Sequence, residues 1–325
     1  MTERTTSPSR IASASPVLVF TGTIFLSAAL LFFVQPLYAR IVLPVLGGAP
    51  AVWTTAMLFF QSVLIAGYLY AHLMIRYVPP PVQLLIHMTL WAAALFFLPL
   101  ALPEGWSPDP NGSAALQTLM AFAVGVGVPF AVLSANAPLL QAWYTRSGGP
   151  SADDPYFLYA ASNLGSLIAL MAFPLVAEPL FGATAIGYGF AIGFGLLGVG
   201  LLLSGRLGLR VPVARQVSEA TGGTITLPQV LAWLLFAFVP SSMMLAVTSK
   251  ISTDVGSIPL IWVVPLALYL LTFVVTFGDG FGATSPRLRL IALPSLLWLA
   301  YVLTGGGGNH LSFWQAGGML LSLIH

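Results

Sequence analysis

The sequence contains no cysteine and very little charge. Without cysteine among its 325 residues, disulfides, thiolate nucleophiles and cysteine-based metal sites are excluded. Only 6% of the residues are charged, against about 25% in an ordinary soluble domain. The 11 basic residues are scattered and form no patch, which argues against nucleic-acid binding. A soluble enzyme is therefore excluded as a description of the whole chain.

What the sequence has in abundance is long apolar runs, since 58% of its residues are hydrophobic. A spanning helix needs about 20 such residues. The runs are bounded by proline, glycine or charge and predict helices at 16–36, 50–73, 82–102, 114–140, 156–181, 183–204, 228–248, 257–277, 288–304 and from 311 onward. We expect an all-α polytopic membrane protein with about ten transmembrane helices. The last run, of about 15 residues, is short for a span and indicates a chain truncated inside a helix.

The basic residues predict the orientation in the membrane through the positive-inside rule. With the N-terminus inside, nine of the 11 basic residues fall in cytoplasmic segments, and only Arg40 and Lys250 fall outside. We therefore expect a multi-pass protein with a cytoplasmic N-terminus.

A sequence similarity between the two halves predicts an internal repeat. The segments PAVW (50–53) and PLIW (259–262) each open a predicted helix and lie 209 residues apart. This spacing keeps equivalent helices in the same orientation, as in the parallel six-helix repeats of major facilitator transporters. We predict a cytosolic tail (1–15), a first six-helix repeat (16–204), a cytosolic linker (205–227) and a truncated second repeat (228–325).

The sequence contains one glycine pattern that matches a dinucleotide-binding fingerprint, GFGLLG at 193–198. A dinucleotide site needs a strand before the glycines, whereas these lie inside an apolar helix. With Gly187 and Gly189 they indicate a small-residue face for close helix packing. No hydrolase, phosphate-loop or metal-ligand pattern occurs, so we predict no catalytic residue, no metal ligand and no cofactor in this chain.

Polar residues at membrane depth are the candidate site residues, because an ionisable or amide group there needs a partner or a cavity. Five are candidates for substrate binding, each with a structural alternative: Gln35 beside Pro36 at the predicted end of the first helix, Asn136 before a kink at Pro138, Asn163 in interhelical hydrogen bonding, Glu178 at the outer interface, and Asp254 as a cap of the eighth helix.

Two further polar positions have a mainly structural interpretation. His87, inside the third helix, is expected to bond a neighbouring backbone carbonyl, with a proton relay as the alternative. Asp154 precedes the fifth helix and is expected to cap it, since a carboxylate there accepts from free backbone N–H groups.

Three segments resemble a known family, the bacterial fused proteins that join a major-facilitator-like membrane module to a spermidine synthase-like domain. They are FFVQP (32–36) with LPVLGGAPAVWTT (43–55), DDPYFLYAASNLGS (153–166), and STDV (252–255) with PLIWVVPLALYLLTF (259–273). The resemblance implies a bacterial inner-membrane location and a following cytosolic domain that uses decarboxylated S-adenosylmethionine or a related nucleoside donor. The acidic, glycine-rich donor site is absent from these 325 residues, so no catalytic residue is carried over.

Two functions are compatible with these observations. The chain is expected to act as a membrane anchor or regulatory scaffold for an aminopropyltransferase-like domain, since it has few buried charges and several glycine-rich faces. The alternative is a small-molecule transporter of the major facilitator type, with a polyamine as one candidate ligand. Besides that ligand, the expected partner is the lipid bilayer, and the sequence leaves the oligomeric state open.

Overall fold

All regular secondary structure described in this chain is helical. The computed structural model describes residues 10–47, 50–102, 105–109, 111–209, 226–255 and 265–272, with the single positions 274 and 301. Within them, six helices are long and apolar enough to cross a membrane, and a bent pair of helices makes a seventh span if it is counted as one. The expectation of an all-helical membrane-spanning protein is confirmed. Apart from residue 301, the predicted helices at 288–304 and from 311 onward lie outside the described residues, and of the predicted helix 257–277 only residues 265–272 and 274 are described.

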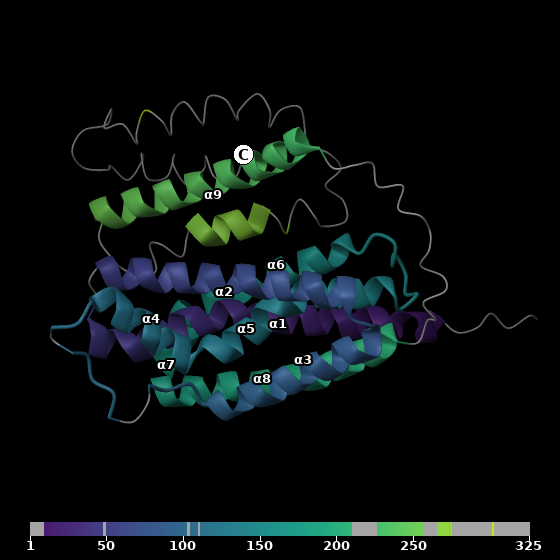
Figure 1. Ribbon diagram of the computed structural model, residues 1–325, viewed down its shortest axis with the longest axis horizontal. Helices are drawn as coiled ribbons and strands as arrows, with labels where there is room; N and C mark the ends of the chain where they lie inside the picture. The colour runs from purple at the N-terminus through teal and green to yellow at the C-terminus, as the bar shows by residue number, and fades with distance from the viewer. Residues whose placement is uncertain are drawn as a thin grey trace, which may run out of the picture. The chain divides into compact units, whose positions relative to one another are not determined.

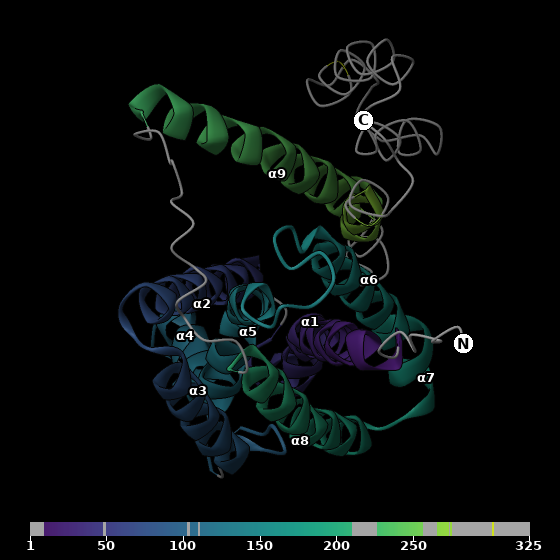
Figure 2. The ribbon, with the colours of Figure 1, turned by 90° about the vertical axis from the view of Figure 1, so that its right-hand side faces the viewer.

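The chain divides into two compact units, residues Met1–Val213 and Ala214–His325. In the first unit, α1 (Arg10–Leu46) packs against α5 (Gly127–Thr145), α6 (Tyr156–Ala172) and α8 (Ala183–Gly208). Seen along the bundle, α1 has these helices around it (Figure 2). Two more helices, α2 (Pro50–Tyr77) and α3 (Pro80–Ala94), pack against α5 from another side. The core of the first unit therefore lies between α1 and α5.

The first helix is longer than the sequence predicted. We expected an end at Pro36, but α1 continues through Pro36 and Pro44 to Leu46. The prediction was wrong because it applied the rule for water-soluble helices, in which a proline ends the helix by freeing backbone groups to water. In an apolar setting the freed carbonyls gain nothing from leaving the helix, so the chain stays helical.

The fourth span is broken, whereas the sequence predicted one helix from Ala114 to Leu140. Ser113 caps α4 (Ala114–Gly125) by accepting a hydrogen bond from the Leu116 amide at 3.4 Å. The chain then turns by 70° at Val126 before α5 begins. Gly125 lies directly against the Tyr38 hydroxyl, where a Cβ atom would overlap it. That hydroxyl donates to the Ala121 carbonyl at 2.6 Å and so supports the end of α4.

The predicted kink at Pro138 is not where the break falls. Pro138 lies inside α5, which runs without interruption from Gly127 to Thr145. The break falls beside Gly125, whose lack of a Cβ atom allows Tyr38 to approach the backbone closely.

The fifth span contains a π-helical turn. It consists of α6, a π-helix at Phe173–Ala177 (η2) and the short helix α7 (Glu178–Leu180), and together they form one apolar span. The sequence predicted a single helix over 156–181, and the prolines at 174 and 179 explain why the helix widens there. The sixth span is α8, which extends four residues beyond the predicted end at Ser204.

Close packing of α8 depends on two of the glycines in the GFGLLG segment. A Cβ atom at Gly198 would overlap the ring of Trp91, and one at Gly193 would lie 3.1 Å from Leu30. At Gly195 and Gly189 a Cβ atom would meet nothing within 4 Å. The predicted packing face is therefore confirmed at Gly193 and Gly198 but wrong at Gly195 and Gly189.

The ends of the helices in the first unit follow the expected alternation. The start of α1 and the loop 146–155 lie at one end of this unit, and the described parts of the loop 98–113 lie at the other (Figure 1). The second unit contributes α9 (Leu227–Val255), whose apolar segment Leu227–Val247 is long enough to span.

Candidate functional site

Four polar side chains of the first unit, three of them buried, form one hydrogen-bonded chain, called here the polar network. His87 Nε2 lies 2.7 Å from Asn136 Oδ1, and Asn136 Nδ2 donates to Ser27 Oγ at 2.8 Å. His87 and Asn136 are both 0% exposed, and Ser27 is 2% exposed. On its other side, His87 Nδ1 lies 3.4 Å from the Tyr70 hydroxyl. The network thus connects α1, α5, α3 and α2.

The partners of His87 define its tautomer. Asn136 gives its amide N–H to Ser27, so its carbonyl oxygen is the atom that accepts from His87 Nε2. Nε2 therefore carries the proton, and Nδ1 is the acceptor for the Tyr70 O–H. Each buried nitrogen of His87 is satisfied by a side chain. The expectation of a backbone carbonyl partner for His87 was wrong, because α3 packs against α5 with His87 opposite Asn136.

A second buried amide lies one turn before His87. Gln83 donates through Nε2 to the carbonyls of Met74 at 3.1 Å and Val78 at 2.7 Å. Its Oε1 accepts from Trp143 Nε1 at 3.0 Å, and the Trp143 ring meets the His87 ring edge-on at 6.2 Å. Gln83 therefore supports the last carbonyls of α2 and joins the turn between α2 and α3 to α5.

Two of the predicted site residues bond to their own helices. Gln35 donates from Nε2 to the Leu31 carbonyl at 3.3 Å, and Asn163 donates from Nδ2 to the Tyr159 carbonyl at 2.8 Å. Asn163 was expected to bond to another helix, but its amide bonds within its own helix. Both side chains are half-buried, and neither joins the polar network.

Neither of the two acidic candidates belongs to the polar network. Glu178 begins α7, and its backbone carbonyl, with that of Phe181, lies 3.5 Å from Arg40 Nη1. Asp254 lies in the last turn of α9, in the second unit, and the start of the predicted eighth helix that it was expected to cap is outside the described residues. Of the five candidates, only Asn136 lies in the polar network.

The carboxylates in the loop before α6 do not cap that helix, contrary to the prediction. The N-cap position of α6 is Pro155, and no side chain caps the helix. Asp154 is exposed, and its backbone amide donates to the Ser151 carbonyl at 3.1 Å. The capping prediction was wrong because Pro155 separates Asp154 from the helix start. In the same loop, partial burial lowers the pKa of the Arg146 guanidinium.

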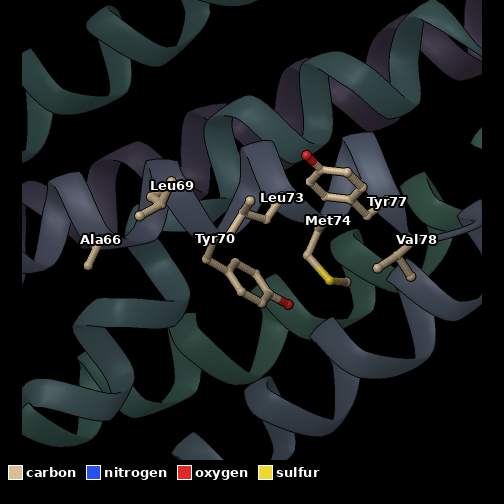
Figure 3. A pocket seen from close by; sticks show the side chains of 7 residues that line it. All are labelled: Ala66, Leu69, Tyr70, Leu73, Met74, Tyr77 and Val78. Carbon is tan, nitrogen blue, oxygen red and sulfur yellow. The ribbon is translucent and has the colours of Figure 1, made fainter.

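One hollow surface adjoins the network, called here the α2 groove. It has a volume of about 470 Å³ and an apolar lining made by Ala66, Leu69, Tyr70, Leu73, Met74, Tyr77 and Val78. Tyr70, Met74 and Val78 extend to the same side of the helix (Figure 3). Tyr70 belongs to both features, because its ring lines the groove and its hydroxyl donates to His87.

Sequence reasoning missed Ser27, Tyr70 and Gln83 as members of this region. Each is a polar residue inside an apolar run, which was the only available signal. Their partners lie 109, 17 and 60 residues away in the chain, so only the folded structure brings them together. Among the described residues, no three histidine, aspartate or glutamate side chains gather as a metal site would require.

The described residues thus form an all-helical protein with six helices long and apolar enough to span a membrane, or seven spans if the bent pair counts as one. No protein-family model matches the chain, and a search of curated proteins also finds no match.

Proposed function

We propose that the first unit is a packed membrane module that anchors and positions an aminopropyltransferase-like domain at the cytoplasmic face of a bacterial inner membrane. The observation that carries this proposal is the completion of the polar network inside the helix bundle. Ser27, Asn136, His87 and Tyr70 bond to one another across four helices. Such internal bonds specify how helices pack, which is what a rigid anchor needs. The attached domain is proposed from the three sequence segments that resemble the fused family.

A second candidate, a small-molecule transporter, has a specific observation in its favour. Two spans of the first unit are irregular, one at the 70° break around Val126 and one at the π-turn 173–177. Discontinuous helices surround substrate sites in many secondary transporters, and π-turns are frequent at functional sites. Gln35, Asn163 and Glu178 are half-buried and would be the candidates to meet a ligand from these spans.

An uptake assay separates the two functions. We expect proteoliposomes containing the full chain to take up radiolabelled spermidine no faster than protein-free liposomes. Saturable uptake that is abolished by Glu178→Gln and Asp254→Asn, but retained by the loop variant Asp109→Asn, would instead establish the transporter.

Sequencing the gene tests directly whether the proposed domain is attached. Reading the frame past codon 325 is expected to reveal a glycine-rich, acidic nucleoside-binding domain. A stop codon at that position would contradict the anchor for an aminopropyltransferase.

The proposed orientation predicts opposite labelling of two loops. Because the chain has no cysteine, each introduced thiol is the only one. We expect Ser107→Cys, in the loop 98–113, to react with an impermeant maleimide in intact spheroplasts. Asp153→Cys, in the loop 146–155, is expected to react only after permeabilisation. Both positions are exposed, so the comparison is matched. The reverse pattern would place the N-terminus outside.

A further inference from the structure

We propose that the α2 groove and Arg76 together form a binding site for one anionic phospholipid. One acyl chain would lie in the groove, and the phosphate would meet the Arg76 guanidinium. This site is independent of the anchoring function proposed above, because it rests on the surface of α2 alone.

The first argument is the position of the groove along its helix. From Ala66 to Tyr77, α2 rises about 17 Å. That is about half of a hydrocarbon core that is roughly 30 Å thick. The groove therefore has about the length of one leaflet, and its Tyr77 end coincides with the end of the apolar span Thr54–Tyr77. Its lining side chains are apolar apart from the two tyrosine hydroxyls, and that of Tyr70 donates inward to His87.

The second argument is that Arg76 is exposed at the Tyr77 end of the groove and that, among the described residues, no acidic side chain pairs with its guanidinium. Its guanidinium carbon lies 5.5 Å from the centre of the Tyr77 ring, and Tyr77 itself lines the groove. This ring contact is the one interaction that the described residues provide for Arg76. The aromatic face fixes the guanidinium beside the groove and leaves its N–H groups directed to an outside acceptor.

Capping of α2 does not account for Arg76. An arginine in the last turn of a helix can bond the free carbonyls there. Among the described residues Arg76 makes a ring contact with Tyr77 and no hydrogen bond to such a carbonyl, and the carbonyls of Met74 in the last turn and of Val78 just beyond it accept from Gln83 Nε2. The guanidinium therefore lies at the end of the apolar span Thr54–Tyr77, beside an apolar groove, with charge that complements a phosphate.

The test measures lipid binding to the full chain by native mass spectrometry. The purified protein is mixed with phosphatidylglycerol or with phosphatidylcholine that has the same acyl chains. We expect the wild type to bind phosphatidylglycerol about fivefold more tightly, the effect of one basic residue near a membrane surface. Arg76→Gln is expected to abolish this preference, and Arg76→Lys is expected to retain most of it, which shows that the site still folds.

Matched controls decide between a site and a diffuse surface charge. Arg206→Gln removes another exposed arginine, near the end of α8, and is expected to leave the preference unchanged. Leu69→Trp fills the groove and is expected to weaken binding of both lipids, whereas Leu58→Trp, exposed on the same helix outside the groove, is not. The proposal is overturned if Arg76→Gln keeps the preference, if Arg206→Gln removes it equally, or if the two tryptophan variants bind alike.

Discussion

Replacing Asn136 by leucine is expected to lower the free energy of unfolding by about 2 kcal/mol. Leucine has a similar size, so the change removes two hydrogen bonds without opening a large cavity. It leaves His87 Nε2–H and Ser27 Oγ buried without the partner that each has in the native chain. Buried groups that lose their partners cost about 1–3 kcal/mol each in soluble proteins and somewhat less in membranes. An SDS titration followed by circular dichroism measures the loss.

The matched control for this prediction is Asn163→Leu. Asn163 bonds only the Tyr159 carbonyl of its own helix and is half-buried. We expect its replacement to change stability by about 0.5 kcal/mol or less. If both variants lose the same stability, the polar network contributes nothing beyond an ordinary surface amide.

Replacing Gly165 by alanine is expected to destabilise the first unit by about 1–3 kcal/mol. At this position α6 crosses α1 so closely that a Cβ atom would overlap the carbonyl oxygen of Phe25. The obstacle is backbone, with the Phe25 carbonyl carbon 3.1 Å away, so no side-chain rotation relieves it. The two helices must separate, and α1 is the helix on which the core is built. The same SDS titration gives the loss of stability.

Gly195→Ala is the control, because alanine there meets nothing within 4 Å. Since alanine favours a helix over glycine by up to about 1 kcal/mol, we expect equal or slightly higher stability. A loss at Gly195 as large as that at Gly165 would contradict the assignment of the effect to the contact between α1 and α6, because helix propensity alone predicts a gain at both positions.

The helical elements were predictable because their cause is local. Each apolar run long enough to span a membrane must satisfy its backbone within one helix, and the described spans correspond to the first seven runs. The start of α4 after Ser113 was also predictable from the sequence, because a serine N-cap acts within one turn of the helix. The predicted boundary at Pro36 failed because the proline rule assumes water around the freed backbone.

The hydrogen-bond partners of the polar side chains could not be predicted from the sequence. Asn136 was singled out because an amide at membrane depth needs a partner, but nothing local says that this partner is His87, 49 residues away. The break near Val126 likewise depends on the Tyr38 hydroxyl from another helix. For Asn163 the same reasoning favoured another helix, and its own backbone proved to be the nearer acceptor.

Hydropathy and backbone hydrogen bonding act within each segment, and they are sufficient to predict an all-helical chain with several helices long and apolar enough to span a membrane. The folded arrangement was needed to show which polar side chains bond to one another, which glycines lie against a neighbouring helix and which charged side chain has no partner among the described residues. Those outcomes depend on how helices distant in the chain pack against one another. The sequence does not reveal this packing, because the apolar faces of the helices have similar compositions.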